Sequence, residues 1–567
     1  MLWPRPVPVV GDRTSAAQRA ADPDGWRFPD AAREALHDVV RARRDVRRFR
    51  PDPVPDDVLE RVLAAAHAAP SVGHSQPWRF VVVDDPAQRD RAAVLADAER
   101  LAQAEQLDPE SARHLLDLQL EGIREAPLGV VVCCDRRAPA AGVLGRATFP
   151  DADLWSCACA IENLWLTARA EGLGVGWVTL FAPADLAALV GLPDGVATLG
   201  WLCLGWPDER PPEPGLERAG WSRRAPLHTV VLRNRWPDGG AGDPVPPPSR
   251  LRAPDQSAVV GARDDADTVL TPLGSLGVLD RAVDRVGALG HRDLSGGTLV
   301  VAVGRHQVVE LGVSAFEDTV TDDLLDALRA GRALGAVAAR AAGLKVAVVD
   351  AGASTGNLRD RDPLTVAAAR RLLAEGAELG GEWGRAGLVA LGEVGVGNTT
   401  VAAALTAAVL GLDAREVVGL GANADSAILA RKTEVVAAAV ARWRRDHTAP
   451  DAAAPARLLA ALGGPELALL TGVVGGVARA GGVVVLDGLA TSVAALVAVD
   501  AEPGVAAHLV AGQRSRERAH PLVLRRLGLE PLLDLRLRAG EGVGAALAAQ
   551  LLISGLTLRT HSARTAP

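Results

Sequence analysis

The sequence has no uninterrupted apolar run of the ~18 residues that a membrane-spanning helix needs. Its most apolar stretch, residues 467–488, is interrupted by glycines and by Arg479. The first residues, MLWPRPVPVVGDR, also lack the apolar core of a secretory signal. We therefore expect a cytoplasmic protein that does not enter a membrane.

Positive charge is not in excess. The 567 residues carry 61 lysines and arginines against 69 aspartates and glutamates, which leaves a formal net charge of −8. The charges are spread along the chain, so no basic patch indicates a nucleic-acid partner. Tyrosine is absent and methionine occurs once, a bias that we attribute to genome composition.

Cysteine is scarce, and no C-x-x-C or H-E-x-x-H motif occurs. The expected state is that of buried, reduced thiols without a metal centre, and zinc or disulfide bonds are the alternative. The five cysteines are Cys133, Cys134, Cys157, Cys159 and Cys203.

Tryptophan marks a boundary in the chain, because ten of the 12 tryptophans lie at or before Trp236. A segment rich in proline and glycine follows directly, as is typical of a linker. The predicted organisation is an N-terminal extension (1–29), a first domain (30–237), a linker (238–262) and a second domain (263–567).

The two predicted domains differ in their patterns. The first alternates helical segments with short apolar strands such as "RFVVVDD" and "LGVVVCCD", which predicts an α+β layer fold. The second has short β-branched runs, "TLVVAVG" and "LKVAVVDAGA" among them, each followed by a helical stretch. This pattern predicts an α/β fold with a Rossmann-like parallel sheet, accompanied by a small helical subdomain.

The first domain carries six arginines between Arg41 and Arg50. Such a cluster is either a solvated basic face or a set of guanidinium forks for phosphate. Farther along, "APSVGHSQPWRFVVV" offers small residues and the amide of Gln76 to a flat ligand. Together the two segments are compatible with a planar cofactor that bears a phosphate.

These segments, with "EGLGVGWVTLF" and "WLCLGW", resemble the flavin-dependent nitroreductase superfamily, and within it the 5,6-dimethylbenzimidazole synthases. The resemblance implies an FMN fold in which reduced FMN and O2 are consumed to form 5,6-dimethylbenzimidazole. It implies catalytic roles for Asp45 and for Thr179, which stands where the family has serine. The implied flavin contacts are Arg43, Arg44, Asp45, Val46, Arg47, Ser71, Gly73, Gln76, Val178 and Thr179.

One departure keeps a second interpretation open. His74 and Ser75 are polar, whereas the synthases have bulky apolar residues at these positions. In this respect the chain is closer to ordinary nitroreductases, which retain FMN as a cofactor. His74 can equally be a solvated loop histidine. Asp45 argues for the synthases, because other nitroreductases commonly have serine at its position.

Two short motifs stand out in the second domain. "LGEVGVGNTT" resembles a phosphate-binding P-loop, except that Asn398 replaces its lysine. Near the end of the chain, Glu541 lies between Gly540 and Gly542 just before an alanine-rich helical stretch. A carboxylate there is either a simple helix cap or a functional group at the positive end of the helix dipole.

These motifs, with "VVGLGANAD" and "VVVLDG", resemble the nicotinate-nucleotide:dimethylbenzimidazole phosphoribosyltransferases. The implied reaction moves ribose 5-phosphate from nicotinate mononucleotide to dimethylbenzimidazole, giving α-ribazole 5′-phosphate and nicotinate. Glu541 maps onto the base of the family and Glu393 onto a second acidic position of the site. The implied substrate contacts are Gly395, Val396, Gly397, Asn398, Thr399 and Lys432.

The second domain also departs from its family. Arg305-His306-Gln307 stands in place of D-H-G, Ala315-Phe316-Glu317 in place of the V-S-P/Y-P region, and Leu270-Thr271-Pro272 where a lysine is usual. Gly512-Gln513 replaces an S-H pair. The phosphate loop and both glutamates are kept, so an active transferase is expected, with altered base specificity or a non-catalytic binding module as alternatives.

The two resemblances describe consecutive steps, because the product of the first enzyme is the acceptor of the second. The sequence thus predicts a bifunctional, cytoplasmic oxidoreductase and glycosyltransferase of cobalamin lower-ligand synthesis. The alternative is a nitroreductase fused to a non-catalytic or altered-specificity module. The resemblance also implies a homodimer or higher homo-oligomer and a flavin reductase that supplies reduced FMN.

Overall fold

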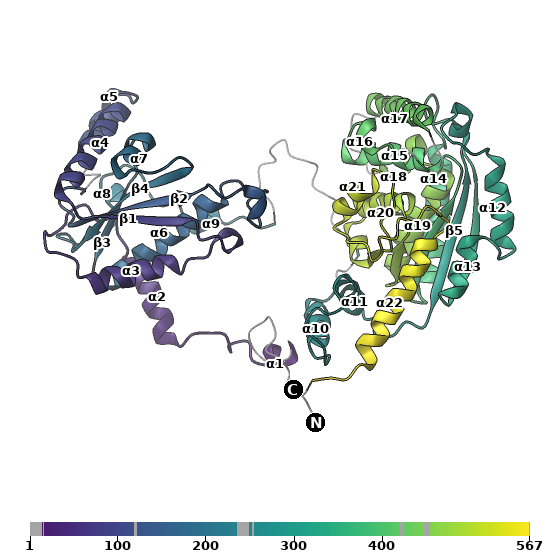
Figure 1. The fold of residues 1–567 in the computed structure, drawn as a ribbon, viewed down its shortest axis with the longest axis horizontal. Coiled ribbons are helices and arrows are strands. Elements are labelled where there is room, and N and C mark those ends of the chain that lie inside the picture. Colours follow the sequence, from purple (N-terminus) through teal and green to yellow (C-terminus); the bar gives the residue numbers. More distant parts are fainter. Residues whose placement is uncertain are drawn as a thin grey trace. The chain divides into compact units, whose positions relative to one another are not determined.

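The computed structural model describes residues 14, 16–117, 122–234, 249–251, 254–419, 421, 425–446 and 454–565. The chain forms two compact units, Trp26–Ala241 and a second that joins Met1–Gly25 to Gly242–Pro567. Their folds are unlike, which confirms the predicted α+β and α/β classes (Figure 1). Residues 238–248 of the predicted linker lie outside the described residues, as do 252 and 253.

The first unit is built on an antiparallel sheet of four strands. Their order is β1 (Trp78–Val83), β2 (Leu128–Asp135), β4 (Val196–Gly205) and β3 (Gly174–Val178). Both faces of the sheet are covered, because alternate residues of β2 point to opposite sides: Val130 and Val132 pack against α3 and α6, whereas Val131 and Cys133 pack toward α4 and α7.

The helical segments of this unit are α2 (Asp30–Ala42), α3 (Asp56–His67), η1 (Val72–His74), α4 (Pro86–Ala104), α5 (Pro109–Asp117), η2 (Ala140–Gly142), α6 (Ala152–Ala170), α7 (Pro183–Val190), α8 (Gly215–Arg218) and α9 (Leu227–Val230). Four of the five cysteines are buried and all five are free thiols. Cys159 is exposed on α6, contrary to the expectation of burial, because it lies on the face of α6 that is turned away from the sheet.

The second unit is built on a parallel sheet of five strands, as predicted. Their order is β6 (Leu344–Ala353), β5 (Gly297–Arg305), β7 (Leu388–Val394), β8 (Val483–Leu486) and β9 (Leu509–Ala511). Figure 1 shows α12 and α13 on one side of β5 and α19 on the other. Because the five strands are parallel, their carboxyl ends all lie along one edge of the sheet, where the ligands of such folds bind.

The sheet separates two buried cores. One core is packed by helices that include α14, α15, α19 and α20, and the other by α11, α12, α13 and α22. The helical segments are α1 (Ala16–Ala21), α10 (Gln256–Asp267), α11 (Val278–Ala288), η3 (Gln307–Leu311), α12 (Thr319–Arg329), α13 (Leu334–Ala341), α14 (Val366–Gly384), α15 (Asn398–Leu410), α16 (Ala414–Val417), α17 (Ser426–Asp446), α18 (Ala454–Leu462), α19 (Pro465–Arg479), α20 (Leu489–Ala501), η4 (Pro503–His508), α21 (His520–Leu527) and α22 (Val543–His561).

The predicted extension and linker both contribute structure to the second unit. Helix α1 packs on α10, where Arg19 Nη2 donates to both carboxylate oxygens of Asp264 over 2.8 and 3.0 Å. Helix α10 begins at Gln256, inside the range assigned to the linker, because Asp255 caps it by accepting from the N–H of Ser257. The linker prediction therefore extends too far.

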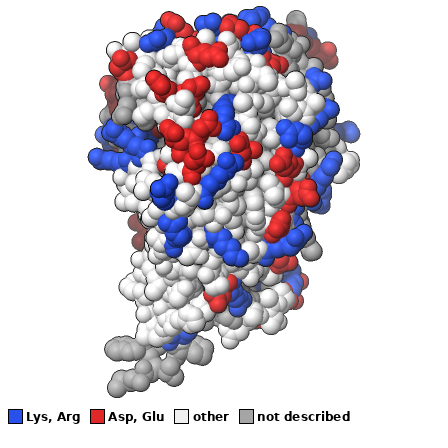
Figure 2. All heavy atoms as spheres, turned by 90° about the vertical axis from the view of Figure 1, so that its right-hand side faces the viewer, with Lys and Arg blue, Asp and Glu red and all other residues white. Residues whose placement is uncertain are grey.

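Helix α22 is long and apolar enough to cross a membrane by length and composition alone. Its side chains Ala545, Ala549 and Leu552 are fully buried in the core beneath the sheet. Its composition is therefore that of a central packing helix. On the face of the molecule in Figure 2, acidic and basic side chains lie interspersed.

Candidate functional sites

In the second unit, the carboxyl edge of the sheet gathers the predicted phosphate loop. Strand β7 ends at Val394, and α15 begins at Asn398. Gly397 caps the helix with a φ of 93°, a left-handed conformation that glycine adopts without steric cost. Asn398, which replaces the lysine of a P-loop, is thereby the first residue of the helix.

Two N–H groups of the loop are bonded within the protein. The N–H of Val396 donates to Thr321 Oγ1 over 3.1 Å, and that of Asn398 donates to the carbonyl of Gly395 over 3.1 Å. The N–H groups of Val396 and Asn398 are thus used internally, whereas sequence reasoning assigned the whole loop to a ligand. Within the described residues, the N–H groups of Gly397 and Thr399 have no such partner and face the space before the helix N-terminus.

Lys432, a predicted substrate contact, lies beside this loop. It is 2% exposed, and its Nζ donates to Thr399 Oγ1 over 3.1 Å. Burial lowers the pKa of Lys432, against a smaller raising effect of Glu517. A buried ammonium at a helix N-terminus is an arrangement that attracts an anion.

Glu541 occupies a strained turn. Gly540, Glu541 and Gly542 have φ values of 66°, 57° and 77°, and a left-handed conformation costs a non-glycine residue about 1–2 kcal/mol. The carboxylate accepts from the N–H of Gly335 over 3.0 Å, and the N–H of Glu541 donates to the carbonyl of Glu393 over 3.3 Å. Two distant motifs of the sequence are therefore in direct contact.

Glu393 is half-buried at the end of β7, among other carboxylates. Its pKa is raised well above the usual value, first by burial and then by the negative charges of Asp487, Glu466 and Glu541. Burial likewise raises the pKa of Asp487 to about 6. The edge of the sheet thus concentrates carboxyl groups that hold protons at unusually high pH. Within the described residues, no cluster suited to a metal ion occurs.

Four residues of this region were not predicted as site residues. His306 Nε2 and Glu466 Oε1 are 3.0 Å apart and fully buried behind the loop, and Gln513 Nε2 donates to Asp487 Oδ1 over 3.0 Å. All four lie in stretches that carry the family resemblance of the sequence. Glu466 carried no local signal beyond its place at the start of an apolar run.

In the first unit, Asp45 is fastened beside β3. It forms a parallel bridge with Val175, and its Oδ1 accepts from the N–H of Trp177 over 3.1 Å. Its Oδ2 accepts from the guanidinium of Arg47. Burial raises the pKa of Asp45 despite the opposing effect of Arg47.

The predicted phosphate arginines are largely engaged within the unit. The guanidinium of Arg43 lies 4.6 Å from the ring centre of Trp165, and Arg44 Nη2 donates to the carbonyl of Pro212 over 2.8 Å. Two donors are left over, because Arg44 Nε and Arg47 Nη1 are buried and have no acceptor within the described residues. A ligand carbonyl or phosphate would satisfy such a donor.

The segment with Ser71, Gly73 and Gln76 forms a tight turn around η1. Ser71 Oγ accepts from the N–H of Gln76 over 3.1 Å, and His74 and Gln76 have φ values of 54° and 47°. Such conformations in residues other than glycine indicate a functional loop. No hydrogen bond or ion pair of the described residues joins this turn to Asp45.

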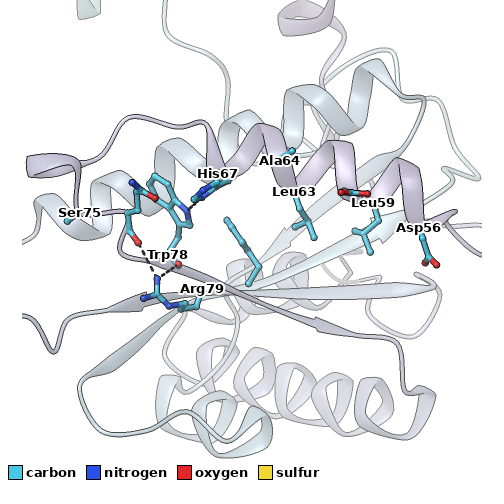
Figure 3. A pocket seen from close by; sticks show the side chains of 11 residues that line it. Asp56, Leu59, Leu63, Ala64, His67, Ser75, Trp78 and Arg79 are labelled. Atoms are coloured by element: carbon cyan, nitrogen blue, oxygen red, sulfur yellow. Dashed lines mark hydrogen bonds between the residues drawn. The ribbon is translucent and has the colours of Figure 1, made fainter.

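A groove of about 820 Å³ opens beside this turn, between α3 and β1 (Figure 3). Its floor is apolar, with Leu59 and Leu63 on α3, and its rim carries His67, which accepts from Trp78 Nε1 over 3.1 Å. Gln76 lines the groove. Val178 is buried at the end of β3, and Thr179 follows it as an exposed residue.

Family models match both halves of the chain. The model described as Phosphoribosyltransferase matches residues 251–566, and the model described as Nitroreductase family matches residues 40–206.

The first half is similar to a 5,6-dimethylbenzimidazole synthase of Rhodospirillum rubrum, with 46% identity over 208 residues, 36% of this chain and 97% of the relative. The second half is similar to a nicotinate-nucleotide–dimethylbenzimidazole phosphoribosyltransferase of Mycobacterium avium, with 39% identity, 52% of this chain and 89% of the relative. The crystal structure of CobT from Thermus thermophilus matches with a TM-score of 0.51 and 37% identity, over 54% of this chain and 97% of that one. Both resemblances seen in the sequence are thereby confirmed.

Proposed function

We propose that this chain, which belongs to the nitroreductase family through residues 40–206 and to the phosphoribosyltransferase family through residues 251–566, performs two consecutive reactions of cobalamin lower-ligand synthesis. The first forms 5,6-dimethylbenzimidazole from reduced FMN and O2. The second transfers ribose 5-phosphate from nicotinate mononucleotide to that base and releases nicotinate. Both steps belong in the cytoplasm, where a flavin reductase supplies reduced FMN.

The observation that carries the second reaction is the juxtaposition of an anion site with carboxyl groups. The loop N–H groups and Lys432 provide positive potential at the start of α15, which suits the single phosphate of a mononucleotide. Glu393 and Glu541, in backbone contact, lie at the same edge of the sheet. A phosphate held at the loop would bring the ribose of the nucleotide toward these two carboxyl groups.

Glu541 is assigned the role of the general base. It takes the N–H proton of the azole, so that the ring nitrogen attacks the anomeric carbon while the bond to nicotinate breaks. The N–H of Gly335 holds one carboxylate oxygen, which leaves the other to accept the proton. Glu393, whose raised pKa favours the protonated form, is suited to donate a hydrogen bond to the nucleotide.

The residues of the first unit fit a flavin. The buried Nη1 of Arg47 requires an acceptor, and Ser71, Gly73 and Gln76 form a turn beside a groove with an apolar floor. Reduced FMN and O2 supply the redox chemistry when bound. Asp45, with its raised pKa, is assigned to hold and release a proton beside the flavin, and Thr179 offers a hydroxyl.

The first unit is proposed to act as a homodimer. Helix α2 is amphipathic, yet none of its residues is buried, and Leu36 and Val40 are 58% and 50% exposed. A second copy that covers this apolar face would remove it from water. A site shared between two copies would also explain why no hydrogen bond or ion pair of the described residues connects Asp45 to the turn of residues 71–76 within one copy.

One experiment tests both reactions. The full chain is incubated with chemically reduced FMN, air and nicotinate mononucleotide, and the products are followed by mass spectrometry. We expect α-ribazole 5′-phosphate and nicotinate. Flavin that is only reoxidised, without loss of its ring system, would contradict the first reaction, and dimethylbenzimidazole without its ribotide would contradict the second.

A further inference from the structure

Asp487 is a carboxylate for which the proposed reaction has no use. It follows the last residue of β8 and is 2% exposed. A buried carboxylate is costly unless it accepts hydrogen bonds. The groups that donate to Asp487 therefore show what it holds.

Three elements meet at this side chain. Asp487 Oδ1 accepts from the N–H of Ala545, in the first turn of α22, over 3.1 Å. The same oxygen accepts from Gln513 Nε2, beyond β9, over 3.0 Å. The N–H of Asp487 itself donates to Thr491 Oγ1 of α20 over 2.9 Å. Asp487 thus connects the edge of the sheet to the start of α22.

The contact with α22 leaves no room for a side chain at Gly544. A Cβ on Gly544 would lie 2.6 Å from Asp487 Oδ1 and 2.4 Å from Gln513 Cδ, so only glycine allows the helix to approach this far. The helix begins at Val543, directly after the left-handed turn of Gly540, Glu541 and Gly542. A shift of the first turn of α22 would therefore shift Glu541.

The turn itself is held by close packing and by two hydrogen bonds of Glu541. A Cβ on Gly335 would lie 2.2 Å from the carbonyl oxygen of Glu541, and one on Gly392 would lie 2.5 Å from the nitrogen of Gly542. The N–H of Glu541 donates to the carbonyl of Glu393 over 3.3 Å, and its carboxylate accepts from the N–H of Gly335. A strained conformation persists only where surrounding contacts impose it. The bond that Asp487 accepts from Ala545 restrains the helix that follows from the side of the sheet edge.

We infer that Asp487 is the positioning residue of Glu541, an inference that rests on the proposed role of Glu541 as base. Asp487 holds the start of α22 so that the carboxylate of Glu541 stays within reach of the azole nitrogen. Gln513, which replaces a histidine of the family pattern, supplies the side-chain N–H that keeps Asp487 in place.

The test measures the transfer reaction of the full chain with dimethylbenzimidazole supplied, which bypasses the first unit. Asp487→Ala should lower kcat by about 100-fold, the lower end of what a general base contributes, with the KM for nicotinate mononucleotide changed by less than about threefold. Asp487→Asn keeps an acceptor oxygen for Ala545 and should recover about tenfold of that loss.

A double-mutant cycle separates positioning from mere stability. If Asp487 acts through Glu541, the Glu541→Ala/Asp487→Ala variant is no slower than Glu541→Ala alone, within about threefold. Losses that multiply would overturn the inference. Normal transfer by Glu541→Ala would instead refute the proposed base, which is a distinguishable outcome.

A matched control addresses folding. Thr365 caps α14 by accepting from the N–H of Ala368 over 3.1 Å, away from the carboxyl groups. Thr365→Ala should lower the melting temperature without changing kcat. If Asp487→Ala unfolds, the variants Asp487→Asn and Gln513→Leu test the inference in its place. An unchanged kcat in both would overturn it. A lowered kcat in folded Gln513→Leu would support it.

Discussion

The two units build their sites in opposite ways. In the second unit, a parallel sheet directs five strand ends to one edge, and Glu393, Asp487 and the phosphate loop meet there within one unit. In the first unit, the antiparallel sheet directs its strand ends both ways, and Asp45 stays without a bond to the turn of residues 71–76 in the described part of the chain. The second site is thus gathered from the strand ends of one unit, whereas no hydrogen bond or ion pair of the described residues joins the predicted flavin segments of the first unit, as the proposed homodimer would explain.

The largest expected effect separates the two reactions at the second site. Glu541→Gln keeps the size of the side chain but removes the base, so transfer should fall by about 100-fold or more. Formation of dimethylbenzimidazole should be unchanged. Mass spectrometry of both products in one reaction measures this, and a variant that transfers ribose at the normal rate would remove Glu541 from the mechanism.

The converse change acts at the first site. Asp45→Asn removes the proton-holding group and its ion pair with Arg47, so dimethylbenzimidazole formation should fall by about 100-fold. Transfer to supplied dimethylbenzimidazole should be unaffected. Tight binding of FMN, checked by fluorescence, would show that the variant is folded, and undiminished synthesis would contradict the role of Asp45.

A third change tests whether dimerisation through α2 is required by the first site and not by the second. Leu36→Glu with Val40→Glu places charges on the exposed face of α2. Since each buried side chain contributes about 1.5–3 kcal/mol, association through α2 should weaken by about 100-fold or more. Analytical ultracentrifugation and both activities check it: synthesis should be lost and transfer kept.

The control for that experiment is Leu101→Glu, on α4, where the leucine is 54% exposed. It adds a charge to an exposed apolar position of another helix of the same unit and should change neither association nor synthesis. Synthesis that survives in the α2 variant would contradict the shared site.

A smaller effect is expected on the pH dependence of stability, which Glu393 of the second site should influence. The pKa of Glu393 is raised in the folded state, so the folded protein binds more protons than the unfolded chain between the two pKa values. Stability is therefore lost as pH rises from about 4.5 through the folded pKa. Glu393→Gln should remove this loss, so that its melting temperature relative to wild type increases between pH 5 and pH 8. Glu378→Gln, at an exposed position of α14, is the control and should show no such increase.

The smallest expected effect concerns the extension that joins the second unit. Arg19→Ala breaks the pair with Asp264 and should destabilise that unit by about 1 kcal/mol, as expected for a partly exposed ion pair. Faster proteolysis between residues 22 and 29 should accompany it. The control is Arg371→Ala, which breaks the exposed ion pair with Glu375. Equal losses of stability in the two variants would contradict a specific role of α1 in stabilising the second unit.

Motifs confined to a few residues could be recognised from the sequence. The loop around Gly397 and the Gly540–Gly542 turn have local signatures, because glycine is needed where φ is positive. Their contact, Glu541 N–H to Glu393 carbonyl, had no signature, since nearly 150 residues separate them. The hydrogen bond from the N–H of Val396 to Thr321 Oγ1 could not be predicted from the sequence either, because Thr321 lies on another helix, α12.

The sequence by itself determined the two fold classes, the two families and the residues of each motif, because hydrophobic periodicity and turn chemistry are local properties. Only the tertiary structure decided which carboxyl groups share the edge of the sheet, since strand order is set by packing between distant segments. It also decided that Asp487 and Gln513 lie beneath α22, that Arg44 and Arg47 keep buried donors without an acceptor in the described residues, and that α1 belongs to the second unit.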